Sequence, residues 1–299
     1  MSPETKVYRK KNNTSDDDWL YEISAKHKFI DLNFKEIWQY RDLLMLFVKR
    51  DIVTVYKQTI LGPLWYLIQP LFTSIIFTLV FNNLGNIQTG EVPPFLFNLA
   101  GITAWNYFKV CLTGTSNTFR ANAGIFGKVY FPRVIMPLSI TISNLLKFGI
   151  QIFIFIGFYA YYYFAQDLNL GFNNTLFLFP IYVFMMALLG LGMGMIISSF
   201  TTKYRDLTVL VSFAVNLLMY LSAVPYPLAE AQKKFPDIVY QFVKYNPVTQ
   251  MIEGFRYMLL NTGSFSWTSV GYIILVCLTT FIIGLIVFNR TEKTFIDTV

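Results

Sequence analysis

Two lysines stand out because they are the charged residues inside the long apolar stretches of this chain. Lys109 and Lys147 each lie within such a stretch, and none of the stretches contains Asp, Glu or His. A charge inside a bilayer is costly, so it usually faces a water-filled cavity or a partner. Their positive charge would attract an anionic substrate, whereas a proton relay would need carboxylates or imidazoles. Snorkelling of the ammonium groups toward the interface is the alternative.

A second candidate group is aromatic. Tyr159, Tyr161, Tyr162 and Tyr163 cluster near the end of the third apolar stretch. Tyrosine and tryptophan concentrate at membrane interfaces, which is the simplest interpretation of the cluster. Aromatic ring faces also stack on carbohydrate, so the same residues are candidates for lining a path for a sugar polymer. The sequence does not assign individual rings to either role.

Six apolar stretches must position these residues, and each has a length that suits a membrane-spanning helix. They comprise residues 64–84, 95–118, 135–165, 175–199, 207–224 and 267–289. About 20 residues at about 1.5 Å rise cross a hydrocarbon core of about 30 Å. With 55% hydrophobic and 14% charged residues in 299, the composition indicates an all-α integral membrane protein. We expect a transmembrane domain over residues 34–290, flanked by polar cytoplasmic tails at 1–33 and 291–299.

Basic residues concentrate in alternate connecting segments, which predicts the orientation of the chain. Eleven of the 24 Lys and Arg residues precede residue 64, and segments 119–134, 200–206 and 290–299 carry seven more. The segments on the opposite side of the first four stretches, at 85–94 and 166–174, carry none. By the positive-inside rule we expect both termini in the cytoplasm. The net charge of +7 then reflects topology and a match to anionic lipid, not nucleic-acid binding.

Residues 34–58 predict an amphipathic helix just before the first stretch. Apolar residues recur there at helical spacing, namely Ile37, Trp38, Leu44, Met45, Val48, Ile52 and Val55. Such a helix normally lies in the interface plane, and its polar face can also meet a cytoplasmic partner. The basic segment 119–134 is expected to be either a short helix parallel to the membrane or a plain connecting loop.

The external segment 225–266 is rich in apolar residues yet too broken to span. Pro236 can start one short helix, and Asn246–Pro247 can end it and start a second. Glu253 and Arg256 stand three apart on the second helix and are placed to pair. We expect a re-entrant helix pair at the external mouth, with a loop resting on the headgroups as the alternative.

Several familiar chemical motifs are absent. Gly190 and Gly194 lie inside an apolar stretch, where they suit close helix approach rather than nucleotide binding. No GxxxxGK[ST] phosphate loop occurs, no cluster suggests a metal site, and the acidic candidates Asp206 and Glu253 are isolated. The two cysteines, Cys111 and Cys277, are expected to pack as small apolar side chains without a disulfide.

At this point the order of elements resembles a known family, the permeases of ABC-type polysaccharide exporters. The most characteristic stretch is YKQTILGPLWYLIQP, from Tyr56 to Pro70. Further similarity lies in YRDL at 204–207 and in Tyr245–Asn246–Pro247. Together these features cover roughly residues 34–290. The branch concerned moves O-antigen, capsule or teichoic acid across the bacterial plasma (inner) membrane.

The resemblance implies a homodimer that takes its power from two cytoplasmic ATPase subunits, with ATP and Mg²⁺ bound there and no cofactor in this chain. The cargo would be a lipid-linked glycan, often on a polyprenyl diphosphate, as in lipopolysaccharide biosynthesis. Segment 225–266 would form an external gate. Docking on the ATPase would use the amphipathic helix and the first cytoplasmic loop, with the basic candidates Lys49, Arg50, Lys57, Arg120, Lys128 and Arg133.

Two other classes of function compete with an exporter permease. An ion-coupled secondary transporter would usually carry intramembrane carboxylates or inverted repeats. A membrane-embedded glycan-processing enzyme would need acidic metal ligands or a general base, and the isolated acids fit that poorly. We therefore expect a transport subunit without catalytic residues of its own.

Overall fold

The computed structural model describes residues 34–57, 62–126, 128–166, 168, 173–204 and 206–295. Across these residues the chain is helical and contains no strand, as the sequence predicts. The residues outside the described part include the expected polar tail at 1–33, residues 58–61 of the YKQTILGPLWYLIQP stretch, and the last four residues, 296–299.

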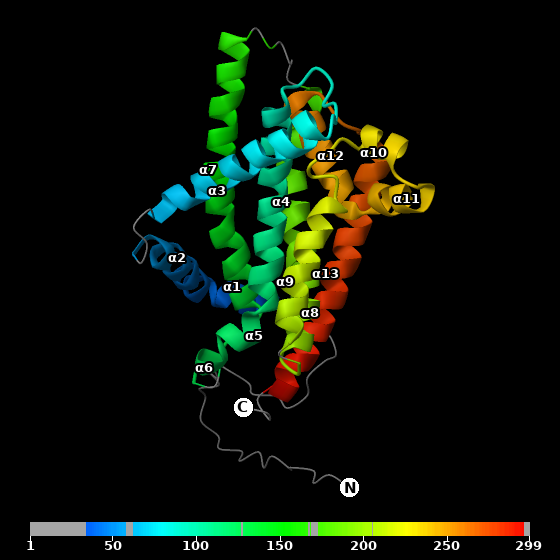
Figure 1. Cartoon of the computed structure of the whole chain (residues 1–299). Helices are drawn as coiled ribbons and strands as arrows, with labels where there is room; N and C mark the ends of the chain where they lie inside the picture. The colour runs from blue at the N-terminus through cyan, green and yellow to red at the C-terminus, as the bar shows by residue number, and fades with distance from the viewer. Residues whose placement is uncertain are drawn as a thin grey trace, which may run out of the picture. The chain divides into compact units, whose positions relative to one another are not determined.

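The helices follow one another along the chain with short connections (Figure 1). They are α1 (Phe34–Gln39), α2 (Arg41–Lys57), η1 (Gly62–Leu64), α3 (Trp65–Phe77), η2 (Thr78–Leu84), α4 (Pro94–Ser116), α5 (Thr118–Ala121), α6 (Ala123–Phe126), α7 (Ile135–Ala165), η3 (Asn174–Leu178), α8 (Phe179–Thr201), α9 (Leu207–Tyr220), α10 (Leu228–Lys234), α11 (Asp237–Tyr245), α12 (Pro247–Leu260) and α13 (Trp267–Phe295).

Four helical runs are long and apolar enough to cross a membrane by length and composition, in the part of the chain described. These are Trp65–Leu84, Ile135–Ala165, Asn174–Thr201 and Trp267–Glu292. Helix α4 has 23 residues, but Asn98, Asn106 and Lys109 make it more polar. Helix α9 is apolar and has 14 residues. It ends at Tyr220, four residues before the expected boundary, where the chain turns through Ala223 at φ +50°.

Helix α8 lies at the centre of the bundle and packs against both α4 and α13. Its glycines make this packing close. A methyl group on Gly190 would come within 2.9 Å of the Cys111 Cβ atom, and one on Gly194 within 2.9 Å of the Leu112 carbonyl oxygen. On the opposite side, a methyl group on Gly192 would lie 2.8 Å from the Phe281 Cα atom. The prediction that small residues permit close helix approach is thus confirmed.

Helix α7 packs along α4, and α2 and α3 contact α7 in turn. Figure 1 shows α2 lying obliquely beside α7, whereas α4, α8, α9 and α13 run roughly parallel. Phe47 and Val48 of α2 are buried, while Met45 and Leu46 are exposed. The helix therefore presents one apolar face to the bundle and further apolar side chains to its surroundings.

The first membrane helix changes its winding halfway. Its continuation η2 has the wider π-helical turn, and Asn82 on that turn reaches across to α4. Asn98 Nδ2 donates to Asn82 Oδ1 at 2.9 Å and to Thr78 Oγ1 at 3.1 Å. This turn brings buried polar groups of two neighbouring helices together.

The segment between α9 and α13 folds into three short helices, α10 to α12, one more than the sequence predicts. Asn246 caps α12, because its side chain accepts from the Val248 amide at 3.0 Å, and Pro247 occupies the first turn. This capping arrangement is typical of a helix start. Helix α12 is mostly buried and packs on α4, α8 and α13. The exposed α11 leaves Ile238 and Phe242 uncovered.

Candidate translocation surface

Lys109 on α4 meets a polar partner on α9. Its Nζ atom lies 3.2 Å from Asn216 Oδ1, joining residues that stand 107 positions apart. Nearby hydroxyl groups bond to their own helices, as Thr113 Oγ1 does to the Lys109 carbonyl and Ser212 Oγ to the Thr208 carbonyl. The Lys109 ammonium and the Asn216 amide are therefore the polar groups that face outward where α4 meets α9. We call this contact between the two helices the α4–α9 seam.

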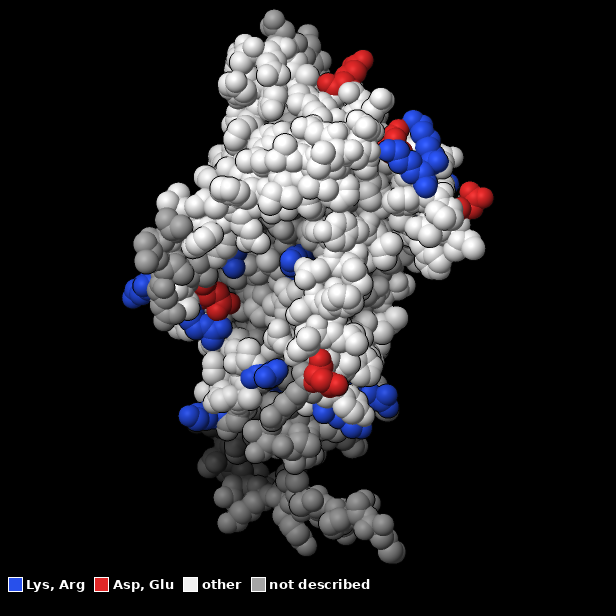
Figure 2. Space-filling view, in the orientation of Figure 1, with Lys and Arg blue, Asp and Glu red and all other residues white. Residues whose placement is uncertain are grey.

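The α4–α9 seam lies on an otherwise apolar surface. In the orientation of Figure 1, Figure 2 shows isolated basic groups amid uncharged side chains near the centre of this face, an acidic group beside basic groups at its left, and further acidic and basic groups toward its upper and lower ends. Large apolar side chains of α9 are exposed beside the α4–α9 seam, namely Val209, Leu210, Phe213 and Leu217. A polar pair inside such a surface is costly unless water or a partner covers it.

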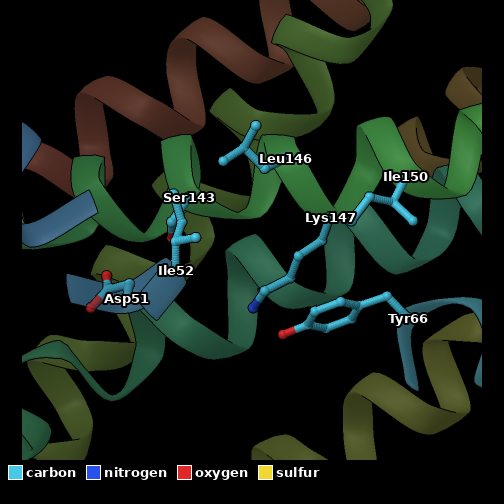
Figure 3. Close-up of a pocket in the computed structure, with 7 residues that line it drawn as sticks. All are labelled: Asp51, Ile52, Tyr66, Ser143, Leu146, Lys147 and Ile150. Atoms are coloured by element: carbon cyan, nitrogen blue, oxygen red, sulfur yellow. The ribbon is translucent and has the colours of Figure 1, made fainter. Parts of the chain in front are cut away.

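Lys147 occupies a separate pocket between α2, α3 and α7 (Figure 3). Its ammonium lies beside the Tyr66 ring, with Nζ 5.1 Å from the ring centroid. The lining comprises Asp51, Ile52, Tyr66, Ser143, Leu146, Lys147 and Ile150. The structure therefore gives the two membrane lysines different surroundings, an amide for Lys109 and an aromatic ring for Lys147.

The tyrosine cluster at the end of α7 divides into two kinds of environment. Tyr159 is buried, with its ring 6.3 Å from that of Phe155. Tyr161 and Tyr163 are exposed, and Tyr162 is half-buried beside Tyr161. Burial makes Tyr159 part of the packing, whereas the exposed rings stay available for an interface or a cargo.

The expected pair on α12 forms and is fully enclosed. Arg256 Nη1 lies 3.5 Å from Glu253 Oε1 and donates to the Ala223 carbonyl at 2.8 Å, while Nη2 donates to the Val224 carbonyl. The guanidinium also lies 3.7 Å from the centroid of the Phe97 ring on α4. Glu253 Oε2 accepts from the Ser264 amide at 3.2 Å. One ion pair thus ties α12 to α4, to the turn after α9 and to the loop before α13.

Burial acts against charge on both members of this pair. It lowers the pKa of the Arg256 guanidinium to about 10, which still leaves the group cationic at neutral pH. Burial also raises the pKa of the Glu253 carboxyl, an effect that Arg256 opposes. The external candidates Pro236, Asn246 and Pro247 lie at the ends of α11 and α12, where they shape the backbone.

The basic candidates for docking differ in exposure. Lys49, Lys57, Arg120 and Lys128 are exposed, and Arg50 is bonded to Asp51 at 2.8 Å. Arg133 is buried: it donates from Nη1 to the Glu292 carbonyl at 2.7 Å and lies over the Phe126 ring. Burial lowers the pKa of Arg133, and Glu292 opposes that shift. Its side chain holds the loop to α13 instead of facing outward.

Sequence reasoning missed a chain of aromatic rings beneath the bundle. Phe47 of α2 lies 5.7 Å from Phe131, which lies 5.8 Å from Phe126. Phe126 contacts Phe119 at 6.0 Å, and Phe119 stacks on Phe288 of α13 at 4.5 Å. The rings connect α2, the 119–134 loop and α13 into one unit. The spacing of apolar residues in the sequence cannot reveal these ring contacts, because the rings come from three segments that are far apart in the chain.

Asn216 was also missed, although a signal for it exists. It is an amide in an otherwise apolar helix, one turn after Ser212, and polar groups in such positions usually have partners. Both cysteines are buried and free, as expected. Among the residues that the structure describes, no group of three or more His, Cys, Asp and Glu side chains could hold a metal ion.

Comparison with known proteins identifies the family of this chain, which the geometry alone does not. The sequence profile of one protein family, described as ABC-2 type transporter, matches residues 42–260 of this chain, from α2 to the end of α12. The chain belongs to the ABC-2 type transporter family. It is therefore a transport subunit and not an enzyme, and it is a multi-pass membrane protein.

Curated relatives in this family are permeases. An O-antigen export system permease protein RfbA of Klebsiella pneumoniae is 29% identical over 258 residues, covering 86% of this chain and 94% of the relative. A second protein of that name from the same species is 27% identical over 257 residues, with the same coverage. A Myxococcus xanthus RfbA is 25% identical over 200 residues, covering 66% of this chain and 73% of the relative.

Proposed function

We propose that this chain is the channel-forming permease subunit of an ATP-driven exporter that moves a lipid-linked polysaccharide out of the cytoplasm. The observation that carries the proposal is similarity to two O-antigen export permeases over 94% of their length, together with a family match over residues 42–260, from α2 to α12. O-antigen is the cargo that these relatives name, and teichoic acid or capsule are chemically similar alternatives. In each case the cargo combines an anionic lipid carrier with a polar glycan.

For topology, we propose six spans with both termini in the cytoplasm of a bacterial cell. Four of these spans are the apolar helical runs. The other two are α4, which is long enough to cross, and α9 together with the turn that follows it. Packing of α4 on α7 and α8 supports its inclusion, because its polar residues are then largely enclosed by protein. An even number of spans also agrees with the distribution of basic residues.

The translocation path is proposed to run along the α4–α9 seam. Lys109 and Asn216 would face water or glycan there, which removes the cost of exposing them to lipid. The apolar side chains of α9 next to them would be covered by a second copy of the chain, so that two such seams enclose one path. The exposed Tyr161 and Tyr163 would meet the glycan or the interface at one end of α7.

The cytoplasmic end is proposed to receive two ATPase subunits, which would bind the ATP and Mg²⁺. Lys49 and Lys57 on α2, with Arg120 and Lys128 in the first loop, offer exposed cations for an acidic surface. The aromatic chain beneath them supplies a rigid link from both docking elements to α13. Movement of an ATPase would thereby reach the membrane helices.

The segment from α10 to α12 is proposed to act as the external gate. The buried Glu253–Arg256 pair makes α12 a firmly attached element. Helix α11 is more exposed and is joined to α12 through Asn246. The mobile part of a gate is therefore expected in α10 and α11, with α12 as its support.

The decisive experiment combines assembly with transport. The tagged chain is co-expressed with a candidate ABC ATPase, purified with it, and reconstituted in vesicles containing a labelled lipid-linked glycan. We expect co-purification and glycan movement that requires ATP. The matched control is an ATPase variant that binds but does not hydrolyse ATP. Failure to bind any candidate ATPase, together with unchanged surface glycan when the chain is deleted from its host, would refute the proposal.

A further inference from the structure

The pocket around Lys147 has an unbalanced positive charge. Asp51 is the acidic residue in the lining, and its Oδ1 accepts from Arg50 Nε at 3.0 Å and from Nη2 at 2.8 Å. One oxygen of that carboxylate is therefore bonded to Arg50, and Arg50, Asp51 and Lys147 together leave one net positive charge. Within the described residues no carboxylate lies within ion-pair distance of the Lys147 ammonium.

The remaining surroundings of Lys147 stabilise a cation only weakly. The Tyr66 ring at 5.1 Å is a cation–π partner, which contributes about 0.5–2 kcal/mol. Leu146, Ile150 and Ile52 offer no polar atom from their side chains, and the hydroxyl of Ser143, which also lines the pocket, donates to the Ile140 carbonyl at 3.0 Å. A half-buried ammonium in such a site would gain stability from an anion outside the chain.

Two independent markers place this ammonium at the level of the inner membrane boundary. Tyr66 is the second residue of α3, so the ring beside Lys147 belongs to the first turn of a membrane helix. Lys147 is followed by 18 residues of α7 before its end at Ala165, a length of about 27 Å, close to one hydrocarbon thickness. The amphipathic α2, which shares the pocket, fits the same level.

We propose that this pocket is a binding site for the phosphate group of an inner-leaflet lipid. The ammonium of Lys147 would pair with a phosphate oxygen at the boundary. The lipid chain would lie along Leu146, which lines the pocket and is exposed, and along the exposed Phe153 two turns further on the same stripe of α7. The site does not depend on the proposed transport function.

Such a phosphate has two sources with the same chemistry, namely a bulk anionic phospholipid and the carrier of a lipid-linked cargo. The full chain is purified in detergent, and lipid binding is measured by native mass spectrometry with four probes. Phosphatidylglycerol is compared with diacylglycerol, and polyprenyl phosphate with polyprenol, so that each pair differs in the phosphate. We expect both phosphate-bearing probes to bind more tightly than their neutral counterparts.

Substitutions assign that preference to Lys147. Lys147→Met should weaken binding of the phosphate-bearing probes about fivefold, which is the effect of one lysine near a membrane surface, and leave the neutral probes unchanged. Lys147→Arg should retain the preference. Lys233→Met is the matched control, because it removes the same charge from an exposed helix outside this pocket and should not alter binding.

Each outcome decides the matter. Preference for polyprenyl phosphate alone supports the site and assigns it to cargo, and preference for both probes assigns it to lipid phosphate in general. An equal loss in Lys233→Met, or a preference that survives in Lys147→Met, overturns the proposal. If Lys147→Met does not fold, a photoreactive phenylalanine derivative at Ile150 in the otherwise unchanged chain must crosslink phosphatidylglycerol in preference to diacylglycerol. Absence of ATP-driven export would not affect these results.

Discussion

Replacing Arg256 by methionine should lower the free energy of unfolding by about 3–5 kcal/mol, because one charge of a buried pair is left without its partner. The substitution removes the hydrogen bonds to the carbonyls of Ala223 and Val224, and it leaves the Glu253 carboxylate enclosed. Methionine fills much of the same volume and can still contact Phe97. The loss therefore reports the polar network rather than a cavity.

The chain carries its own reporter for this measurement. Cys111 and Cys277 are free and buried, so a dye that fluoresces on reacting with thiols follows thermal unfolding of the detergent-solubilised protein. At about 2–4 °C per kcal/mol, the Arg256→Met melting temperature should fall by about 6–20 °C. All variants must be heated at the same rate, since unfolding of such a protein is expected to be irreversible.

Two comparisons sharpen the test. Glu253→Gln should cost less than Arg256→Met, because a neutral amide can still accept from the Ser264 amide and Arg256 keeps its carbonyl partners. The matched control is Lys233→Met, which breaks the exposed i, i+3 pair with Glu230 in the same segment and should cost under about 0.5 kcal/mol. An Arg256→Met protein that melts within about 2 °C of the wild type would refute the account of α12 as anchored by this pair.

Three further predictions concern packing, the path and a helix cap. Gly192→Ala should lower the melting temperature by several degrees, since its methyl group would lie 2.8 Å from the Phe281 Cα atom, whereas Gly149→Ala, with nothing within 4 Å, should leave it unchanged or raise it. Lys109→Met should reduce ATP-driven glycan export severalfold without altering co-purification with the ATPase; wild-type export would remove this residue from the path. Asn246→Ala should lose about 1 kcal/mol through the α12 cap and more through the hydrogen bonds that Nδ2 donates to the Leu221 carbonyl and Ser222 Oγ, whereas Asn246→Asp keeps the cap and should lose less in the same dye assay; equal losses would argue against capping.

Patterns confined to a few neighbouring residues proved the most predictable part of the chain. Continuous apolar runs indicated helices near 135–165 and 175–199, because a backbone in lipid must satisfy its own hydrogen bonds. The start of α12 followed from Asn246 and Pro247, and the Glu253–Arg256 pair from helical spacing. Boundaries were less predictable: α9 ends early, where a residue with positive φ turns the chain.

Exposure of the candidate residues could not be read from residue type. Arg133 and Lys128 belong to the same basic loop, yet one is buried against α13 and the other is exposed. Tyr159 and Tyr161 are two positions apart on one helix, and a rotation of about 200° places them on different faces. Which face meets the bundle depends on neighbouring helices, so tyrosines that look equivalent in the sequence acquire different environments.

The sequence by itself determined that this chain forms membrane helices free of carboxylates, with lysines as its charges inside the apolar stretches. Composition and local hydrogen bonding suffice for that, because lipid leaves the backbone few alternatives. Only the tertiary structure decided what each lysine meets. Lys109 pairs with an amide on α9, while Lys147 faces Tyr66 in a pocket that retains a net positive charge. These contacts depend on how distant helices pack, and no short stretch of sequence records that.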